Sequence, residues 1–90
     1  MLETTVRLTN ILGLHARAAA QLVRLSNRFE SSIVLTRFDN AVTANAKSIL
    51  SVLSIAASYG VELQITADGV DERDAINQIT KLFADKFGEE

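Results

Sequence analysis

The residue in this chain with the clearest capacity for chemistry is His15, its only histidine. Arg17 follows two positions later, inside the stretch GLHARAAAQL that spans residues 13–22. A neutral imidazole is a nucleophile near physiological pH, and the forked guanidinium of arginine suits phosphate oxygens. This pair of residues therefore has the means to accept a phosphoryl group and to stabilise the product.

The flanking sequence places His15 at the start of a helix. An alternating run over residues 4–9 predicts a strand, Gly13 permits a sharp exit from it, and a run of alanines begins at Ala16. The first turn of a helix offers unpaired N–H groups and a partial positive charge, which together favour a bound phosphate. We expect Ala16 and Arg17 to bind the phosphoryl group.

Other interpretations of these residues remain open at this point. A single histidine and arginine at a strand–helix junction also fit a helix cap or a solvated loop. A metal site lacks support, because the chain has neither a second histidine nor a cysteine. A serine hydrolase lacks the G-x-S-x-G sequence that presents the nucleophile.

Composition sets the class of protein. The chain has 90 residues, 48% hydrophobic and 22% charged, with a formal net charge of −2, which predicts one globular domain over 1–90. The periodicity of its apolar residues makes the fold class of this domain α+β. Basic residues form no cluster, so we expect no nucleic-acid partner. Disulfides are excluded because there is no cysteine. The first ten residues do not resemble a signal peptide, and no apolar run is long enough for membrane insertion, so we expect a cytoplasmic protein.

The hydrophobic periodicity predicts the order β-α-β-β-α-β-α. Strands are expected over residues 4–9, 31–38, 41–45 and 61–66, and helices over 16–29, 48–59 and 70–87. Alternation in the strands indicates a sheet with one face covered by helices and the other facing solvent.

Two segments carry a resemblance to a known family. GLHARAAAQLV and NAKSILSVLSIAASYG resemble the active-centre and regulatory-serine segments of HPr, the histidine-containing phosphocarriers of the phosphoenolpyruvate-dependent phosphotransferase system, with proteobacterial features. The spacing of the segments fits, and the resemblance covers essentially the whole chain. It implies an HPr-like open-faced sandwich, with a four-stranded antiparallel sheet and three helices on one face.

The resemblance also implies roles for individual residues. His15 would be phosphorylated on Nδ1 by enzyme I, and Arg17 would contact the phosphoryl group. Ser48 would be the regulatory site of HPr kinase/phosphorylase, in organisms that have that enzyme. Partner docking would involve Ala20, Gln21, Arg24, Ile49, Leu50 and Leu53.

Three observations qualify these roles. Ala18 replaces the proline usual in the family, and we expect the helix start to keep its geometry, since alanine is a strong helix former. Ser48 also suits the N-cap of its helix, a role compatible with phosphorylation. The helix after Ser48 carries more apolar residues than one buried face can hold, so Ile49 and Leu50 should be partly exposed beside His15.

The sequence therefore predicts a monomeric carrier that relays phosphate stoichiometrically from phospho-enzyme I to an enzyme IIA domain, without a cofactor of its own. The alternative is a mainly regulatory module, of nitrogen-branch or kinase-controlled type, without sugar transport. A third possibility, a small ligand-binding domain, would require both matching segments to be coincidental.

Overall fold

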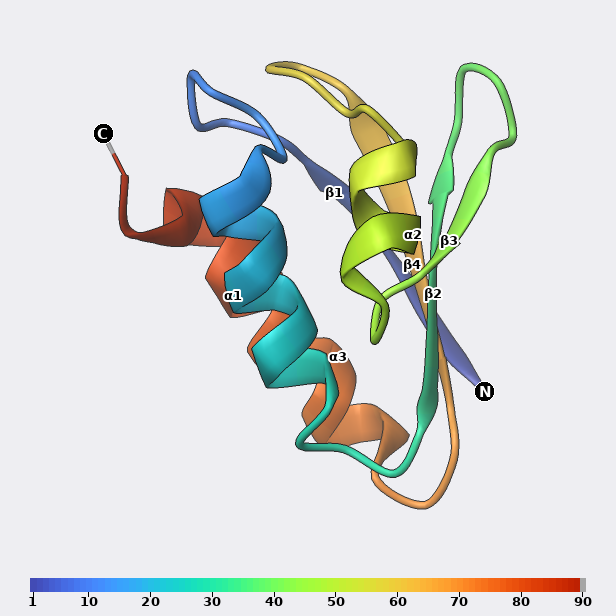
Figure 1. Cartoon of the computed structure of the whole chain (residues 1–90). Coiled ribbons are helices and arrows are strands. Elements are labelled where there is room, and N and C mark those ends of the chain that lie inside the picture. Colours follow the sequence, from blue (N-terminus) through green and yellow to red (C-terminus); the bar gives the residue numbers. More distant parts are fainter. Residues whose placement is uncertain (90) are drawn as a thin grey trace.

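The computed structural model describes residues 1–89 and shows a four-stranded antiparallel sheet with three α-helices on one face (Figure 1). In chain order the elements are β1 (Leu2–Arg7), α1 (Ala16–Ser26), β2 (Ser32–Arg37), β3 (Thr43–Asn45), α2 (Ile49–Ser54), β4 (Glu62–Asp68), α3 (Glu72–Ala84) and the 3₁₀ turn η1 (Lys86–Gly88). The predicted open-faced α+β sandwich is confirmed.

The last strand, β4, lies inside the sheet. The spatial order is β1-β4-β2-β3, and β4 pairs antiparallel with both β1 and β2. Leu63, Ile65 and Ala67 of β4 are fully buried under the helices, whereas the alternate residues Gln64 and Thr66 are only half-buried. This period of two gives the sheet one core face and one open face.

The core lies between that sheet face and the helices. Each helix contributes at least one fully buried side chain, such as Leu22 in α1, Val52 in α2 and Ile79 in α3. Burial of one helix face is what the sequence pattern predicted. Among residues 1–89, no helix is long and apolar enough to cross a membrane.

Element boundaries differ from the sequence-based expectation. The predicted helix over 16–29 ends at Ser26, and Phe29 is buried in the following turn. The helix predicted over 48–59 ends at Ser54. A positive φ of 52° at Ala56 reverses the chain there without a glycine to mark the turn. The last helix ends at Ala84 and gives way to η1.

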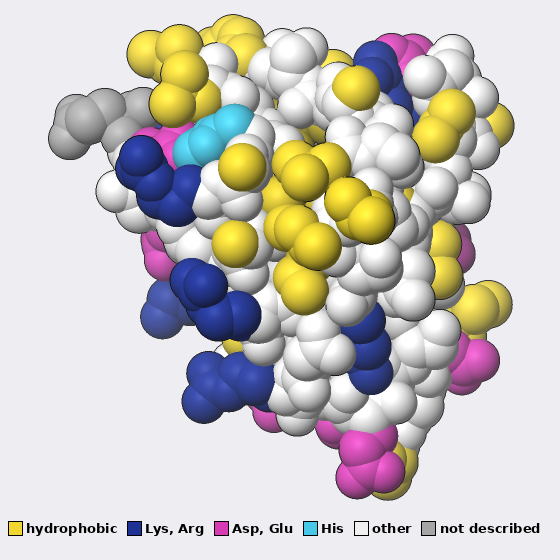
Figure 2. All heavy atoms as spheres, viewed as in Figure 1, with side chains coloured by type: hydrophobic (Ala, Val, Ile, Leu, Met, Phe, Trp, Pro, Cys, Tyr) yellow, Lys and Arg dark blue, Asp and Glu magenta, His cyan; other side chains and the backbone are white. Residues whose placement is uncertain are grey.

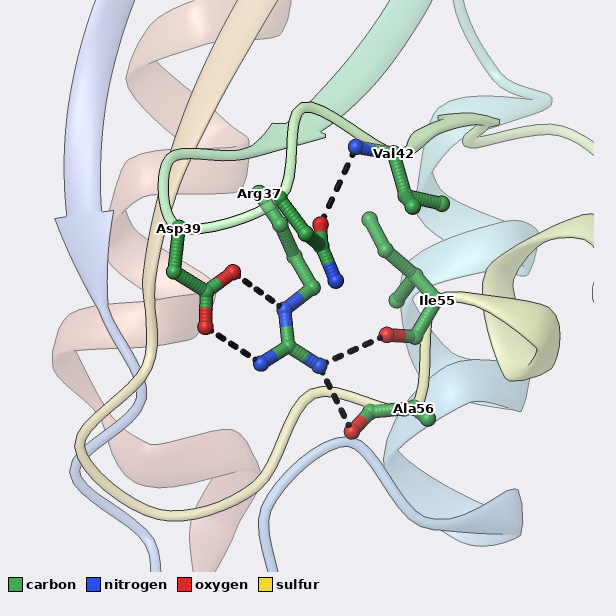
Figure 3. A network of polar contacts seen from close by, with 6 residues as sticks. Arg37, Asp39, Val42, Ile55 and Ala56 are labelled. Atoms are coloured by element: carbon green, nitrogen blue, oxygen red, sulfur yellow. Dashed lines mark hydrogen bonds and ion pairs between the residues drawn. The ribbon is translucent and has the colours of Figure 1, made fainter.

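Both ends of α2 are tied by side chains. At the start, the hydroxyl of Ser48 accepts a hydrogen bond from Ser51 N (3.3 Å). Just past the helix, Arg37 Nη1 donates to the carbonyls of Ile55 (3.1 Å) and Ala56 (3.2 Å) (Figure 3). Asp39 holds the same guanidinium from its other side, so a β2 side chain fixes the C-terminal end of α2.

Gly13 fixes the approach to α1. Its φ is +64°, and a Cβ there would lie 2.8 Å from Ala57 O and from Ser58 Cα. Only glycine suits both the left-handed backbone and this close approach. The next residue, Leu14, donates its N–H to Ala57 O (2.9 Å), which docks the loop against the segment after α2 and delivers His15 to the helix start.

Candidate functional site

His15 is the N-cap of α1, as its sequence context predicted. Its backbone is extended (φ −75°, ψ 179°), and its side chain makes no capping hydrogen bond. The first helical hydrogen bond runs from Ala19 N to His15 O (2.8 Å). The N–H groups of Ala16, Arg17 and Ala18 precede that bond, so helix geometry gives them no partner within α1. The imidazole therefore stands beside an end of α1 that favours anions.

Ala16 and Arg17 are both exposed in the first turn of α1. Exposure leaves the guanidinium free to turn toward a group on the imidazole. Ala18, in the position where the family has proline, is fully buried and continues a regular helix. The expected geometry of the helix start is therefore retained despite the substitution.

Two residues join the site that the sequence did not indicate: Glu89 from the C-terminal segment and Asn10 from the loop between β1 and α1. Glu89 Oε2 contacts His15 Nε2, and Glu89 Oε1 accepts a hydrogen bond from Asn10 Nδ2 (3.0 Å). The hydrogen bond from Asn10 is the main cause that lowers the pKa of Glu89 below its usual value; burial opposes it, and His15 and Arg17 add to the lowering. A carboxylate thus lies against the imidazole.

An apolar surface lies next to the histidine. Ile49, Leu50 and Leu53 of α2 are 38%, 77% and 37% exposed, while Val52 and Ile55 on the other side of the helix are buried. In Figure 2 the histidine lies between this patch of hydrophobic side chains and a group of basic side chains. The expectation that Ile49 and Leu50 are exposed is confirmed; their role in docking stays a prediction.

The other predicted docking residues differ from one another. Arg24 is exposed, Ala20 is half-buried, and Gln21 donates from Nε2 to Phe87 O (3.2 Å), so its amide helps to hold the C-terminal segment. Sequence reasoning missed Ile11 and Leu12, which are 75% and 65% exposed in the loop before His15. They add exposed apolar side chains to the loop that precedes His15. Two adjacent apolar residues in a predicted loop were the signal from which the sequence could have identified them.

Ser48 lies at the N-cap of α2 and is half-buried, with its hydroxyl engaged in the cap. The predicted capping role is confirmed. Helices α1 and α2 pack against each other on the same sheet face (Figure 1), and Figure 2 shows the histidine and the apolar patch on one side of the molecule. Ser48 directly precedes the residues of that patch at the start of α2.

Comparison with known proteins decides the family. The family model described as "PTS HPr component phosphorylation site" matches residues 2–85. The chain belongs to the PTS HPr family. It is 44% identical to the phosphocarrier protein HPr of Treponema pallidum over the full length of both chains. It is 39% identical to the phosphocarrier protein NPr of Proteus mirabilis, over 94% of this chain and 93% of that one.

A solved HPr structure shows the same architecture. The crystal structure of HPr-C-His from Thermoanaerobacter tengcongensis matches with a TM-score of 0.93 and 39% identity, over 100% of this chain and 99% of that one. Membership of the family makes phosphate carriage within the phosphotransferase system the function of the HPr domain, and directs attention to the chain's single histidine.

Proposed function

We propose that His15 accepts a phosphoryl group from phospho-enzyme I and passes it to an enzyme IIA domain in the cytoplasm. The observation that carries this proposal is the position of the imidazole at the N-cap of α1, with Arg17 in the following turn. The Nδ1 lone pair forms a bond to phosphorus, and the bond from phosphorus to the donor atom of enzyme I breaks. Its electron pair stays on the donor, so no cofactor or co-reactant is needed.

The helix start and Arg17 supply the electrostatic part of this transfer. The first-turn N–H groups, including those of Ala16 and Arg17, are directed out of the end of α1, where negative charge is favoured. The Arg17 guanidinium adds a permanent charge and parallel donors for two phosphoryl oxygens. The N–H groups and the guanidinium both interact more strongly with the phosphoryl group as its bond to His15 forms.

A two-step relay assay tests the proposal. The protein is incubated with enzyme I and phosphoenolpyruvate, isolated, and then mixed with enzyme IIA. We expect the label to move onto the protein and then onto the IIA domain, with neither step occurring for His15→Ala. Labelling of IIA that does not depend on His15 would contradict the relay.

Docking is assigned to the exposed face of α2 and the adjacent surface of α1. Ile49, Leu50 and Leu53 offer apolar contact, and Arg24 and Ala20 continue this surface on α1. An apolar centre with a charged rim is the usual composition of a transient interface. Leu50→Ser removes the most exposed of these side chains from the contact, so we expect it to raise the KM for the protein in the enzyme I reaction.

Regulation is assigned to Ser48. A phosphate there would lie at the N-cap of α2, where the helix tolerates negative charge, but beside Ile49 and Leu50. The added charge would oppose docking of a partner that is complementary to an apolar surface. Incubation with HPr kinase/phosphorylase should give acid-stable phosphate in the protein and none in Ser48→Ala. Phosphate at Ser51 or Ser54 in its place would refute the assignment.

A mainly regulatory function is the second candidate, favoured by the similarity to an NPr phosphocarrier. It predicts faster phosphorylation by a nitrogen-branch donor than by a sugar-branch enzyme I. Initial rates with the two donors under identical conditions separate these branches.

A further inference from the structure

Glu89 lies 74 positions from His15 in sequence, yet its side-chain carboxylate faces the imidazole. The His15 and Glu89 side chains are 23% and 14% exposed, so the contact is largely shielded from solvent. Oε2 of the carboxylate contacts His15 Nε2, and Oε1 accepts from Asn10 Nδ2. The carboxylate therefore bridges the histidine and the loop that precedes it.

The position of Glu89 is set by the packing of the segment before it. Phe87 is buried, at 3% exposure, and its ring meets Phe83 of α3 edge to face with centroids 4.9 Å apart. Left-handed backbone at Lys86 and Phe87, both with φ 55°, turns the chain back toward α1 after α3 ends. Gln21 then binds Phe87 O from α1. In Figure 1 the η1 turn accordingly lies beside the start of α1.

Asn10 connects the same carboxylate to the loop before the helix. Its side chain is fully buried, and Nδ2 donates both to Gly13 O (2.7 Å) and to Glu89 Oε1 (3.0 Å). One amide thus fixes the turn that delivers His15 and the carboxylate that faces it. The carboxylate has a defined orientation toward the ring.

The direction of the hydrogen bond follows from the chemistry of the partners. An ionised carboxylate accepts hydrogen bonds and donates none, so His15 Nε2 must carry the proton. In a neutral imidazole the other nitrogen, Nδ1, then has a free lone pair. Nδ1 is the atom to which the proposed function assigns the new bond to phosphorus.

We infer that Glu89, oriented by Asn10, is a positioning residue that holds His15 in the tautomer whose Nδ1 is the nucleophile. The inference rests on the proposed function of His15. A second consequence follows for the phosphorylated protein. When Nδ1 bonds to phosphorus and Nε2 keeps its proton, the ring carries positive charge, which the facing carboxylate offsets.

The first test reads the tautomer directly, without any partner protein. The ¹⁵N shifts of the two ring nitrogens are measured at a pH where the ring is neutral, in the unaltered protein, Glu89→Ala and Glu89→Gln. We expect a protonated Nε2 and a bare Nδ1 in the unaltered protein. Glu89→Ala should shift both signals toward a mixture of tautomers, and Glu89→Gln should restore them in part, because its amide oxygen still accepts from Nε2.

The second test is the rate of phosphoryl acceptance from enzyme I. We expect Glu89→Ala to lower kcat about twofold to tenfold, the effect of one lost hydrogen bond, with KM unchanged and partial rescue in Glu89→Gln. Asp85→Asn is the matched control, since it removes the same charge from an exposed position in the same terminal segment. It should leave rate and tautomer unchanged.

The outcomes separate the two proposals. Ring-nitrogen shifts that are unchanged in Glu89→Ala would overturn the positioning role. Faster phosphoryl acceptance by Glu89→Ala would also overturn it, because the carboxylate would then be blocking access to the imidazole. If the unaltered protein took no phosphate while the shifts behaved as expected, the proposed function would fail and the effect of Glu89 on the tautomer would stand.

Discussion

At the scale of the residue, the Arg17 side chain takes no part in the packing of the core. Its side chain is exposed, and no hydrogen bond to it is found within residues 1–89. A guanidinium that makes no hydrogen bond to residues 1–89, two positions from a nucleophile, is available for the reacting phosphoryl group. Its contribution should therefore show in the rate of transfer and not in stability.

Arg17→Ala is expected to slow phosphoryl acceptance about tenfold or more, because a preorganised cation at the transferred group is lost. The free energy of unfolding should change by less than about 0.5 kcal/mol, as for other exposed sites. Rapid-quench kinetics and urea denaturation measure the two quantities. Arg17→Lys keeps the charge but loses the paired N–H donors of the guanidinium, so we expect an intermediate rate. An unchanged rate for Arg17→Ala would contradict the contact between Arg17 and the phosphoryl group.

Residues of the site differ in how far the sequence could predict them. His15 and Arg17 are neighbours at one helix start, so local pattern and the capping rules were enough. Glu89 and Asn10 join the site through a long-range contact that depends on how η1 turns back toward α1. At that turn Lys86 and Phe87 have positive φ, and neither residue type would lead one to predict a left-handed backbone.

At the scale of the element, α2 is a short helix that depends on its ends. It has six residues, too few to be stable by propensity alone. The sequence revealed one end, because Ser48 is a preferred N-cap residue. The C-terminal end of the helix was predicted too far along the chain, because the helix stops before Ala56. The carbonyls of Ile55 and Ala56 accept hydrogen bonds from Arg37, which is distant in sequence.

Arg37→Ala should destabilise the protein by about 1 to 2 kcal/mol, because the carbonyls of Ile55 and Ala56 lose a charged donor. Hydrogen exchange of the α2 amides should accelerate with it, and urea denaturation gives the stability change. Asp39→Ala is the matched control, since the Asp39 side chain is 59% exposed and its ion pair with Arg37 should add little to stability. Equal effects of the two variants would place the stabilisation in the ion pair and contradict the cap.

At the scale of the whole molecule, the alternating strands and amphipathic helices were sufficient to predict one α+β domain with an open sheet face. The antiparallel sheet was implied by the family resemblance, but the spatial order β1-β4-β2-β3 was not predicted, since hydrophobic alternation does not say which strands are neighbours. The expectation of a monomer stays a prediction.

Acid stability depends on a carboxylate that joins distant parts of the molecule. Asp71, before α3, accepts hydrogen bonds from Ser31 Oγ, from Glu30 N (2.8 Å) and from Ser31 N (2.9 Å), next to the start of β2. The Ser31 hydroxyl is the leading cause that lowers the pKa of Asp71, with the Glu30 N–H next, and burial opposes them.

A lowered pKa in the folded state gives stability that is complete above the unfolded-state pKa and is lost as the pH falls through the folded-state pKa. Asp71→Asn removes this dependence. The stability difference between the two proteins should be constant near neutral pH and shrink as the pH falls below about 4, the unfolded-state range of aspartate. Urea denaturation across pH measures it; a difference that grows on acidification would contradict the lowered pKa.

The central claim is that His15 carries the phosphoryl group, and intact-mass analysis after incubation with enzyme I and phosphoenolpyruvate tests it most directly. The account predicts the addition of one phosphoryl group that is lost in acid, retained in Ser48→Ala and absent in His15→Ala. Acid-labile phosphate on folded His15→Ala, or none on the unaltered protein with active enzyme I, would contradict it.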